Sequence, residues 1–189
     1  FATVARVAQS TGFTGVQIHA AHGYLLSSFL SPVTNRRQDQ WGGSLANRAR
    51  FLLQTVRRVR ATVGANFPVA VKLNSADFQK GGFGEDDCLQ VVEWLNDEGI
   101  DLLEISGGNY EQPRLLGYSG RDESAADERE LRDSTREREA YFLDFAAKVR
   151  DVRKMPLMVT GGFRTMAVME SALQSGDADV IGLGRPLCT

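Results

Sequence analysis

Residues 68–73 read Pro-Val-Ala-Val-Lys-Leu, a proline followed by a short apolar run that ends with a single lysine and a leucine. Runs of this length and composition are typical of strands that are buried on both faces of a parallel sheet. Four other short segments have a similar β-rich form, at 15–19, 102–105, 156–160 and 180–183. Because helical patterns separate them, the sequence predicts right-handed βαβ units and a parallel α/β sheet.

The helical patterns begin and end at residues that favour helix caps. Five helices are predicted: one in which the chain opens and which ends at Gly12, one from Ser44 to Val63, one through Leu89, Val92 and Leu95 to Gly99, one over about 139–152, and one from Thr165 to Gly176. A polar loop with many charges of both signs occupies 107–137. Its length is typical of a lid or an interface segment.

The loops that follow the last two predicted strands distinguish between two folds that contain a parallel sheet. A doubly wound sheet usually has a GxGxxG turn after its first strand, and this chain has none there. In a (β/α)₈ barrel the loops after strands seven and eight often bind phosphate, and the exits here, 160–164 and 182–185, are rich in glycine. The fold predicted is therefore an incomplete (β/α)₈ TIM barrel with strands 4 to 8 present and strands 1 to 3 missing.

The length agrees with that strand count, since a full barrel takes about 250 residues and this chain has 189. No linker or low-complexity segment divides it, so we expect one partial barrel domain over 1–189. With 42% hydrophobic and 24% charged residues, the composition is that of a globular protein. The net charge of -2 argues against nucleic acid or anionic membrane as a partner and favours a small molecule.

Neither a membrane span nor a leader is expected from the hydropathy pattern, because no apolar run approaches the roughly 20 residues of a membrane-spanning helix. A cytoplasmic location is the resulting expectation. The two cysteines, Cys88 and Cys188, have no CxxC spacing and are predicted to be packing residues.

Both histidines of the chain fall in the stretch His19-Ala20-Ala21-His22-Gly23-Tyr24, at the C-terminal end of the first predicted strand. Two imidazoles at such a position can donate hydrogen bonds to one carbonyl oxygen, and a phenol is a competent proton donor. A structural histidine pair and a metal site are the competing interpretations. Zinc needs a further ligand, and neither a cysteine nor a glutamate at HExxH spacing supplies one, so no metal is predicted.

Lys72 stands near the end of a buried strand, where its ammonium group needs a partner or water. In a barrel mouth it can stabilise an anion. Alternatively it reaches solvent by snorkelling or forms an ion pair with Glu104 of the neighbouring strand, and spacing does not separate these possibilities. The glycine-rich exits also have two interpretations, as plain turns or as a phosphate site, and their place in the last two loops favours phosphate.

A longer motif accompanies these residues. Residues 30–50 read LSPVTNRRQDQWGGSLANRAR, and the N-R-R-x-D-x-W-G-G-S-x-x-N-R element joined to HxxHGYL is far more specific than any glycine pattern. Together they resemble the old yellow enzyme family of NAD(P)H:flavin oxidoreductases, and the resemblance covers nearly the whole chain.

The resemblance implies that FMN lies across the barrel mouth, takes hydride from NAD(P)H, and passes it from N5 to the β-carbon of an activated alkene. By position, it implies that His19 and His22 bind the substrate carbonyl and that Tyr24 protonates the α-carbon. Lys72 falls where the family usually has an arginine beside the flavin N1 and O2 edge, so a cation is kept and the planar fork is lost. The residues implied for the FMN phosphate are the backbone of Gly161, Gly162, Gly184 and Arg185, with the Arg185 side chain.

The resemblance also implies that Arg37, Asp39, Trp41 and Arg48 fix the long loop onto the rim through a buried ion network. Two alternatives to an ene-reductase stay open: a catalytically silent fragment of such an enzyme, and another phosphate-binding barrel enzyme that uses Lys72 as a Schiff-base or general-base residue. The sequence specifies neither the alkene, nor the choice between NADH and NADPH, nor the oligomeric state.

Overall fold

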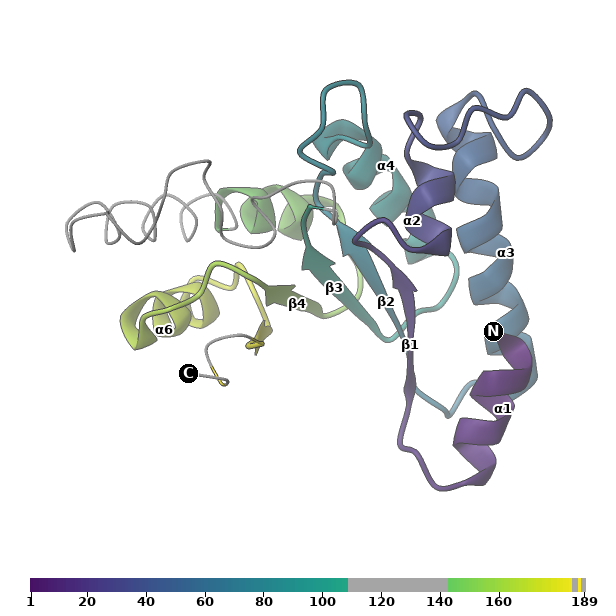
Figure 1. Ribbon diagram of the computed structural model, residues 1–189. Helices are drawn as coiled ribbons and strands as arrows, with labels where there is room; N and C mark the ends of the chain where they lie inside the picture. Colours follow the sequence, from purple (N-terminus) through teal and green to yellow (C-terminus); the bar gives the residue numbers. More distant parts are fainter. Residues whose placement is uncertain (109–142, 185–186, 188–189) are drawn as a thin grey trace.

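A computed structural model describes residues 1–108, 143–184 and 187, and its centre is one five-stranded sheet (Figure 1). The strands, which are all parallel and paired in the order of the sequence, are β1 (Val16–Ala20), β2 (Val69–Asn74), β3 (Leu102–Ser106), β4 (Leu157–Thr160) and β5 (Val180–Gly182). The predicted α/β class and parallel sheet are confirmed.

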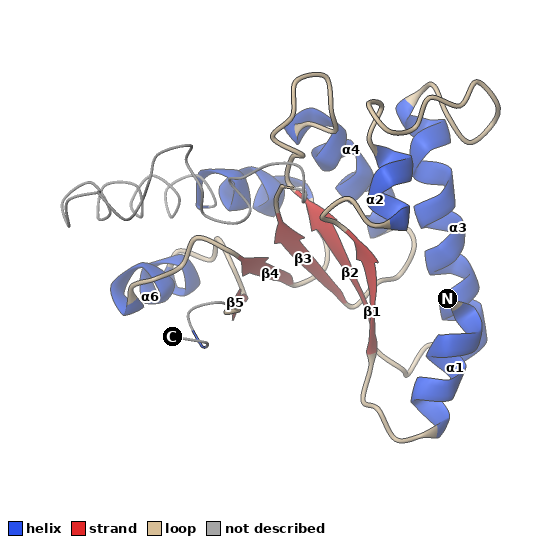
Figure 2. Cartoon of the chain, in the orientation of Figure 1, coloured by secondary structure: helices blue, strands red, loops and turns tan. Residues whose placement is uncertain are grey.

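Helices lie on the outer side of the curved sheet (Figure 2). They are α1 (Ala2–Ser10), α2 (Leu25–Leu30), α3 (Leu45–Val63), α4 (Glu85–Asn96), a helix of which 143–152 is described, and α6 (Met166–Gln174). The cap predicted at Ser44 is confirmed, because its Oγ accepts a hydrogen bond from the Asn47 N–H at 3.4 Å. The six-residue helix α2 was not predicted. In the described ranges, no helix is both long and apolar enough to cross a bilayer.

Side chains alternate between the two faces of the sheet, and the outer face carries the core. Ile18, Val71, Leu73, Leu103 and Ile105 belong to one apolar cluster with residues of α3 and α4, and each is at most 4% exposed. The residues between them in the strands therefore point to the concave face.

Cys88 of α4 lies in the same cluster, so its predicted packing role is confirmed. Cys188, Arg185 and all but two residues of the predicted loop at 107–137 lie outside the described residues.

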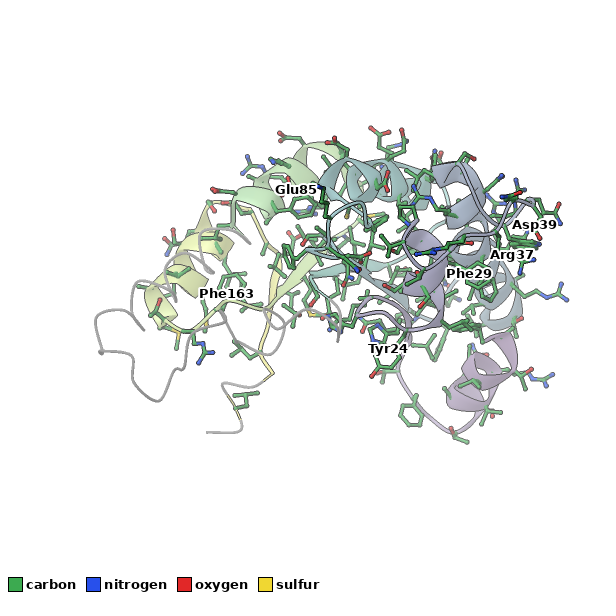
Figure 3. All side chains as sticks on the ribbon, turned by 45° about the horizontal axis from the view of Figure 1, so that its top comes forward. Tyr24, Phe29, Arg37, Asp39, Glu85 and Phe163 are labelled. Atoms are coloured by element: carbon green, nitrogen blue, oxygen red, sulfur yellow. The ribbon has the colours of Figure 1, made fainter. Side chains whose placement is uncertain are left out.

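The prediction of a buried ion network in the long loop is wrong for Arg37 and Asp39. Their side chains are 53% and 48% exposed, and they pair with each other at the edge of the molecule, away from Tyr24 (Figure 3). Two residues apart, they can stiffen only their own turn.

Arg48 is instead the buried anchor of that loop. Its guanidinium donates to the Leu30 and Gly43 carbonyls and, at 3.1 Å, to the Asp87 carboxylate of α4. Trp41 adds an edge-on ring contact with Phe51 of α3. Further bonds attach the loop to α2 and α3, from Asn35 to the Phe29 carbonyl, from Asn47 to the Gly42 carbonyl and from Arg50 to the Gln40 carbonyl.

One amide side chain joins the loops that follow the first three strands. Asn74, at the end of β2, is 1% exposed, and its Oδ1 accepts a hydrogen bond from the backbone N–H of His22 at 3.1 Å. Its Nδ2 donates to Asp77 Oδ1 at 3.1 Å and to the Gly108 carbonyl at 3.0 Å. The φ of His22 is 62°, in the left-handed region that non-glycine residues rarely adopt. The Asn74 amide therefore stabilises a strained backbone position beside the sheet edge.

Replacing Asn74 by alanine leaves the His22 N–H and the Gly108 carbonyl without this partner. We expect a loss of about 1–3 kcal/mol of unfolding free energy, the cost of leaving a buried polar group unsatisfied. Asn74→Asp keeps the acceptor for His22 but places a carboxylate against Asp77, and it should cost at least as much. Denaturant unfolding of the full-length protein measures both losses.

Asn96→Ala is the matched control, because Asn96 bridges the Val152 carbonyl and the Lys154 N–H at 2.8 Å each, before β4 begins. It should also destabilise the fold, while only the Asn74 variants shift the NMR signals of the His22 imidazole. Signals of His22 that stay in place in Asn74→Ala would show that Asn74 does not hold this loop.

Candidate active site

The carboxyl ends of β1 and β2 bring four predicted site residues together. His19 lies directly opposite Lys72 in the parallel register. The ring centroid of His19 is 5.4 Å from that of His22 and 4.9 Å from that of Tyr24. The Tyr24 side chain remains exposed at the edge of the sheet formed by the carboxyl ends of the strands, which we call the rim. Two imidazoles, a phenol and an ammonium group thus share one site, while the roles assigned to them stay predictions.

Both imidazoles are surrounded by conditions that oppose protonation. Burial, together with the positive charge of Lys72, lowers the pKa of His22 to about 4. The same two causes, with burial the larger, lower the pKa of His19. At neutral pH His22 is therefore a neutral ring, and its Nε2 lies 2.8 Å from Ser106 Oγ. A neutral imidazole carries one N–H and one bare nitrogen, and the Ser106 hydroxyl can bond to either by accepting or by donating.

A buried ring nitrogen at the site has no protein partner in the described part of the chain. It is Nδ1 of His19. Buried polar atoms are nearly always hydrogen-bonded, so an unsatisfied nitrogen on a residue that faces the concave side of the sheet fits a site that a polar ligand completes.

Lys72 forms the ion pair that the sequence left as one of its possibilities. Its Nζ is 2.7 Å from Glu104 Oε1, with the two side chains 17% and 5% exposed. The other carboxylate oxygen accepts a hydrogen bond from Gln17 Nε2 at 2.7 Å. Burial raises the pKa of Glu104, but its bonds with Lys72 and other neighbours outweigh burial and hold the pKa below its usual range. A Schiff-base role would require the Lys72 amine to leave this carboxylate.

The glycine-rich exits of β4 and β5 lie side by side, because Thr160 pairs with Gly182 in register. Gly161 and Gly162 have φ angles of 118° and 82°, a conformation that favours glycine. A Cβ on Gly182 would lie 1.8 Å from Thr160 Oγ1, whereas one on Gly184 would meet no described atom within 4 Å. Adjacent loops with bare backbone of this kind fit a bound phosphate, although the fourth predicted residue, Arg185, is not among those described.

Sequence reasoning missed three residues of the site: Gln17, Asn74 and Ser106. The sequence does contain a signal for them, which is the alternation of polar and apolar residues along the strands. In 17–19, 72–74 and 104–106 the polar residues stand two apart, with one apolar residue between them. This spacing places the polar residues of all three strands on one face.

Comparison with known proteins gives a family match over the whole chain. The model of the NADH:flavin oxidoreductase / NADH oxidase family matches residues 1–189. The NADH-dependent flavin oxidoreductase iccE of Talaromyces variabilis is 41% identical over 98% of this chain and 44% of its own length. The NADPH dehydrogenase of Bacillus subtilis is 31% identical over 99% of this chain and 49% of its own length. The chain thus spans less than half of each of these relatives.

Solved structures agree with this match. A 2-naphthoyl-CoA reductase superposes with a TM-score of 0.82 at 32% identity, over 96% of this chain and 26% of its own. The old yellow enzyme homologue from Zymomonas mobilis superposes with a TM-score of 0.70 at 31% identity, over 96% of this chain and 45% of its own. On this evidence, the chain belongs to the NADH:flavin oxidoreductase / NADH oxidase family, the family of the old yellow enzymes.

Proposed function

We propose that the protein containing this chain is an FMN-dependent oxidoreductase that transfers hydride from NAD(P)H, through the flavin, to an activated alkene. The observation that carries the proposal is the cluster of His19, His22, Tyr24 and Lys72 at one sheet edge, in a chain of this family. In this proposal β1 to β5 are strands 4 to 8 of a (β/α)₈ barrel, and the protein works in the cytoplasm.

Bound FMN supplies the hydride at its N5, and the residues of this chain bind and orient the reactants. Neutral imidazoles suit a carbonyl substrate, because an N–H donor stabilises negative charge that develops on the oxygen. The unsatisfied Nδ1 of His19 is one candidate contact. His22 is held by Ser106 and by Asn74, so its ring is positioned before the substrate binds.

Tyr24 follows His22 after one glycine, and its ring contacts His19. In the proposal its hydroxyl delivers the proton to the α-carbon of the alkene. Because the side chain is 47% exposed, the phenol can recover its proton from solvent.

The remaining site residues hold the cofactor in this proposal. Lys72 supplies positive charge beside the N1 and O2 edge of the flavin, where negative charge collects on reduction. The backbone of Gly161, Gly162 and Gly184, with Arg185, holds the phosphate. The alternatives of a silent fragment or an aldolase-like enzyme gain no support from these relatives, which are named as an oxidoreductase, a dehydrogenase, a reductase and an old yellow enzyme homologue.

Substitutions at the two histidines and the tyrosine should separate the two half-reactions in the full-length protein. Replacing His19 or His22 with alanine should slow alkene reduction by about 100 to 1000-fold, the usual cost of one preorganised donor. Reduction of FMN by NAD(P)H should suffer less, because no enone oxygen is present in that step. Tyr24→Phe should slow alkene reduction with little change in ligand affinity, most of all where the α-carbon needs enzymic protonation.

Stopped-flow absorbance of the flavin measures both half-reactions. Asn96→Ala is a suitable control, since it removes two hydrogen bonds remote from the rim. Equal damage to both half-reactions in all three variants would mean that these residues only maintain the fold of the site.

The charge of Lys72 should affect the flavin directly. Lys72→Met removes a cation that stabilises the reduced, anionic flavin, so the reduction potential should fall. Lys72→Arg keeps the charge and should largely preserve it. Spectroelectrochemical titration ranks the two variants against the wild type, and an unchanged potential and FMN affinity in Lys72→Met would leave Lys72 as a structural residue.

A further inference from the structure

Three polar side chains from three neighbouring strands form one hydrogen-bonded unit beneath the rim. Glu104 of β3 is at its centre, and both of its carboxylate oxygens are engaged at 2.7 Å, Oε1 by Lys72 of β2 and Oε2 by Gln17 of β1. In register, Glu104 is directly opposite Lys72, which is directly opposite His19. The unit therefore lies immediately beside the candidate catalytic residues.

Without such a partner, a lysine side chain does not hold its ammonium group at one place. Its ammonium is a point charge on a flexible four-carbon stem, and fixing that stem costs conformational entropy. Glu104 is itself fixed by Gln17, so the carboxylate offers Lys72 one acceptor at one place. The side chain of Glu104 is 5% exposed, so solvent screens the pair little.

The charges of Lys72 and Glu104 both act on the two histidines at the rim. The positive charge of Lys72 lowers the pKa values of both His19 and His22, while the negative charge of Glu104 raises both. Each charge thus partly cancels the other at the positions where ligands would bind.

We propose that Glu104 is a positioning residue for Lys72, which fixes the ammonium group beneath the rim and offsets its charge, so that the flavin experiences a lysine–glutamate pair rather than a full cation. This inference rests on the proposed function, because it assumes a flavin at the rim. It adds a residue that contacts neither substrate nor cofactor and acts through Lys72.

The inference predicts opposite changes for the two members of the pair. Glu104→Gln leaves the Lys72 charge uncompensated and should raise the reduction potential of bound FMN. Lys72→Met leaves the carboxylate uncompensated and should lower it. The double variant Lys72→Met/Glu104→Gln removes both charges and should return the potential toward the wild-type value.

Each single variant should change the ratio of the affinities for reduced and oxidised FMN by about tenfold, which is about 30 mV for a two-electron couple. Spectroelectrochemical titration of the full-length flavoprotein measures this change. A matched control is the exposed pair of Lys148 and Glu85, which has the same 2.7 Å separation on outer helices. Lys148→Met and Glu85→Gln should leave the potential unchanged.

A second measurement needs no flavin. In the apoprotein, NMR titration of the imidazole signals reports the field of the pair at His22, and the pKa of His22 should fall in Glu104→Gln and rise in Lys72→Met. If Glu104→Gln does not fold, because it leaves a buried ammonium group unpaired, the double variant decides by comparison with Lys72→Met alone.

Different results would overturn the proposed function and the role of Glu104. Wild-type protein that binds no flavin would overturn the proposed function, while the apoprotein titration would still show whether the pair exists. A wild-type flavoprotein in which Glu104→Gln leaves the potential unchanged would overturn only the role of Glu104. So would a double variant whose potential equals that of Lys72→Met.

Discussion

Parallel pairing in sequence order brings the carboxyl ends of all five strands to the same edge of the sheet, and the candidate site depends on this constraint. It places His19, Lys72 and Glu104 in one row across β1, β2 and β3, although they are separated by dozens of residues in the chain. Loops that leave one edge must also be kept apart and in order. Asn74, the last residue of β2, bonds to three of them through a single amide, so the geometry of the site depends on a residue to which no chemical role is assigned.

The charge state of the site follows from the burial of Lys72, Glu104 and the two histidines at the sheet. A charged pair inside a protein loses hydration, and the loss is repaid only with good geometry and further hydrogen bonds. Glu104 meets this condition through Lys72 and Gln17. Next to this pair, His19 and His22 remain neutral donors, since burial and the nearby ammonium group both disfavour their charged forms. The site therefore holds one compensated charge pair and two uncharged rings rather than a cluster of cations.

Strand and helix order was predictable because each apolar run, such as Val69–Leu73, is a local signal. The cluster of His19, His22 and Tyr24 was predictable for the same reason, since one short stretch contains all three. The bonds of Asn74 were not, because they join residues up to 52 positions apart and depend on the register of three strands. The family resemblance also misplaced Arg37 and Asp39, which pair with each other at the surface. Helix α2, with six residues and no side-chain cap, was too short to leave a periodic pattern.

Gly182 and Gly184 differ in how strongly the surrounding residues exclude a side chain, and this affects how each position can change in evolution. At Gly182 the neighbouring Thr160 excludes any side chain, so packing within the protein is enough to keep this glycine during evolution. At Gly184 no described atom opposes a Cβ, and its φ lies outside the left-handed region, so neither the described packing nor the backbone geometry requires a glycine there. Selection against larger residues there would therefore come from a ligand or from a part of the full-length protein other than the described residues. Among natural variants, the tolerance of this one position therefore shows whether a ligand or another part of the full-length protein occupies the loop.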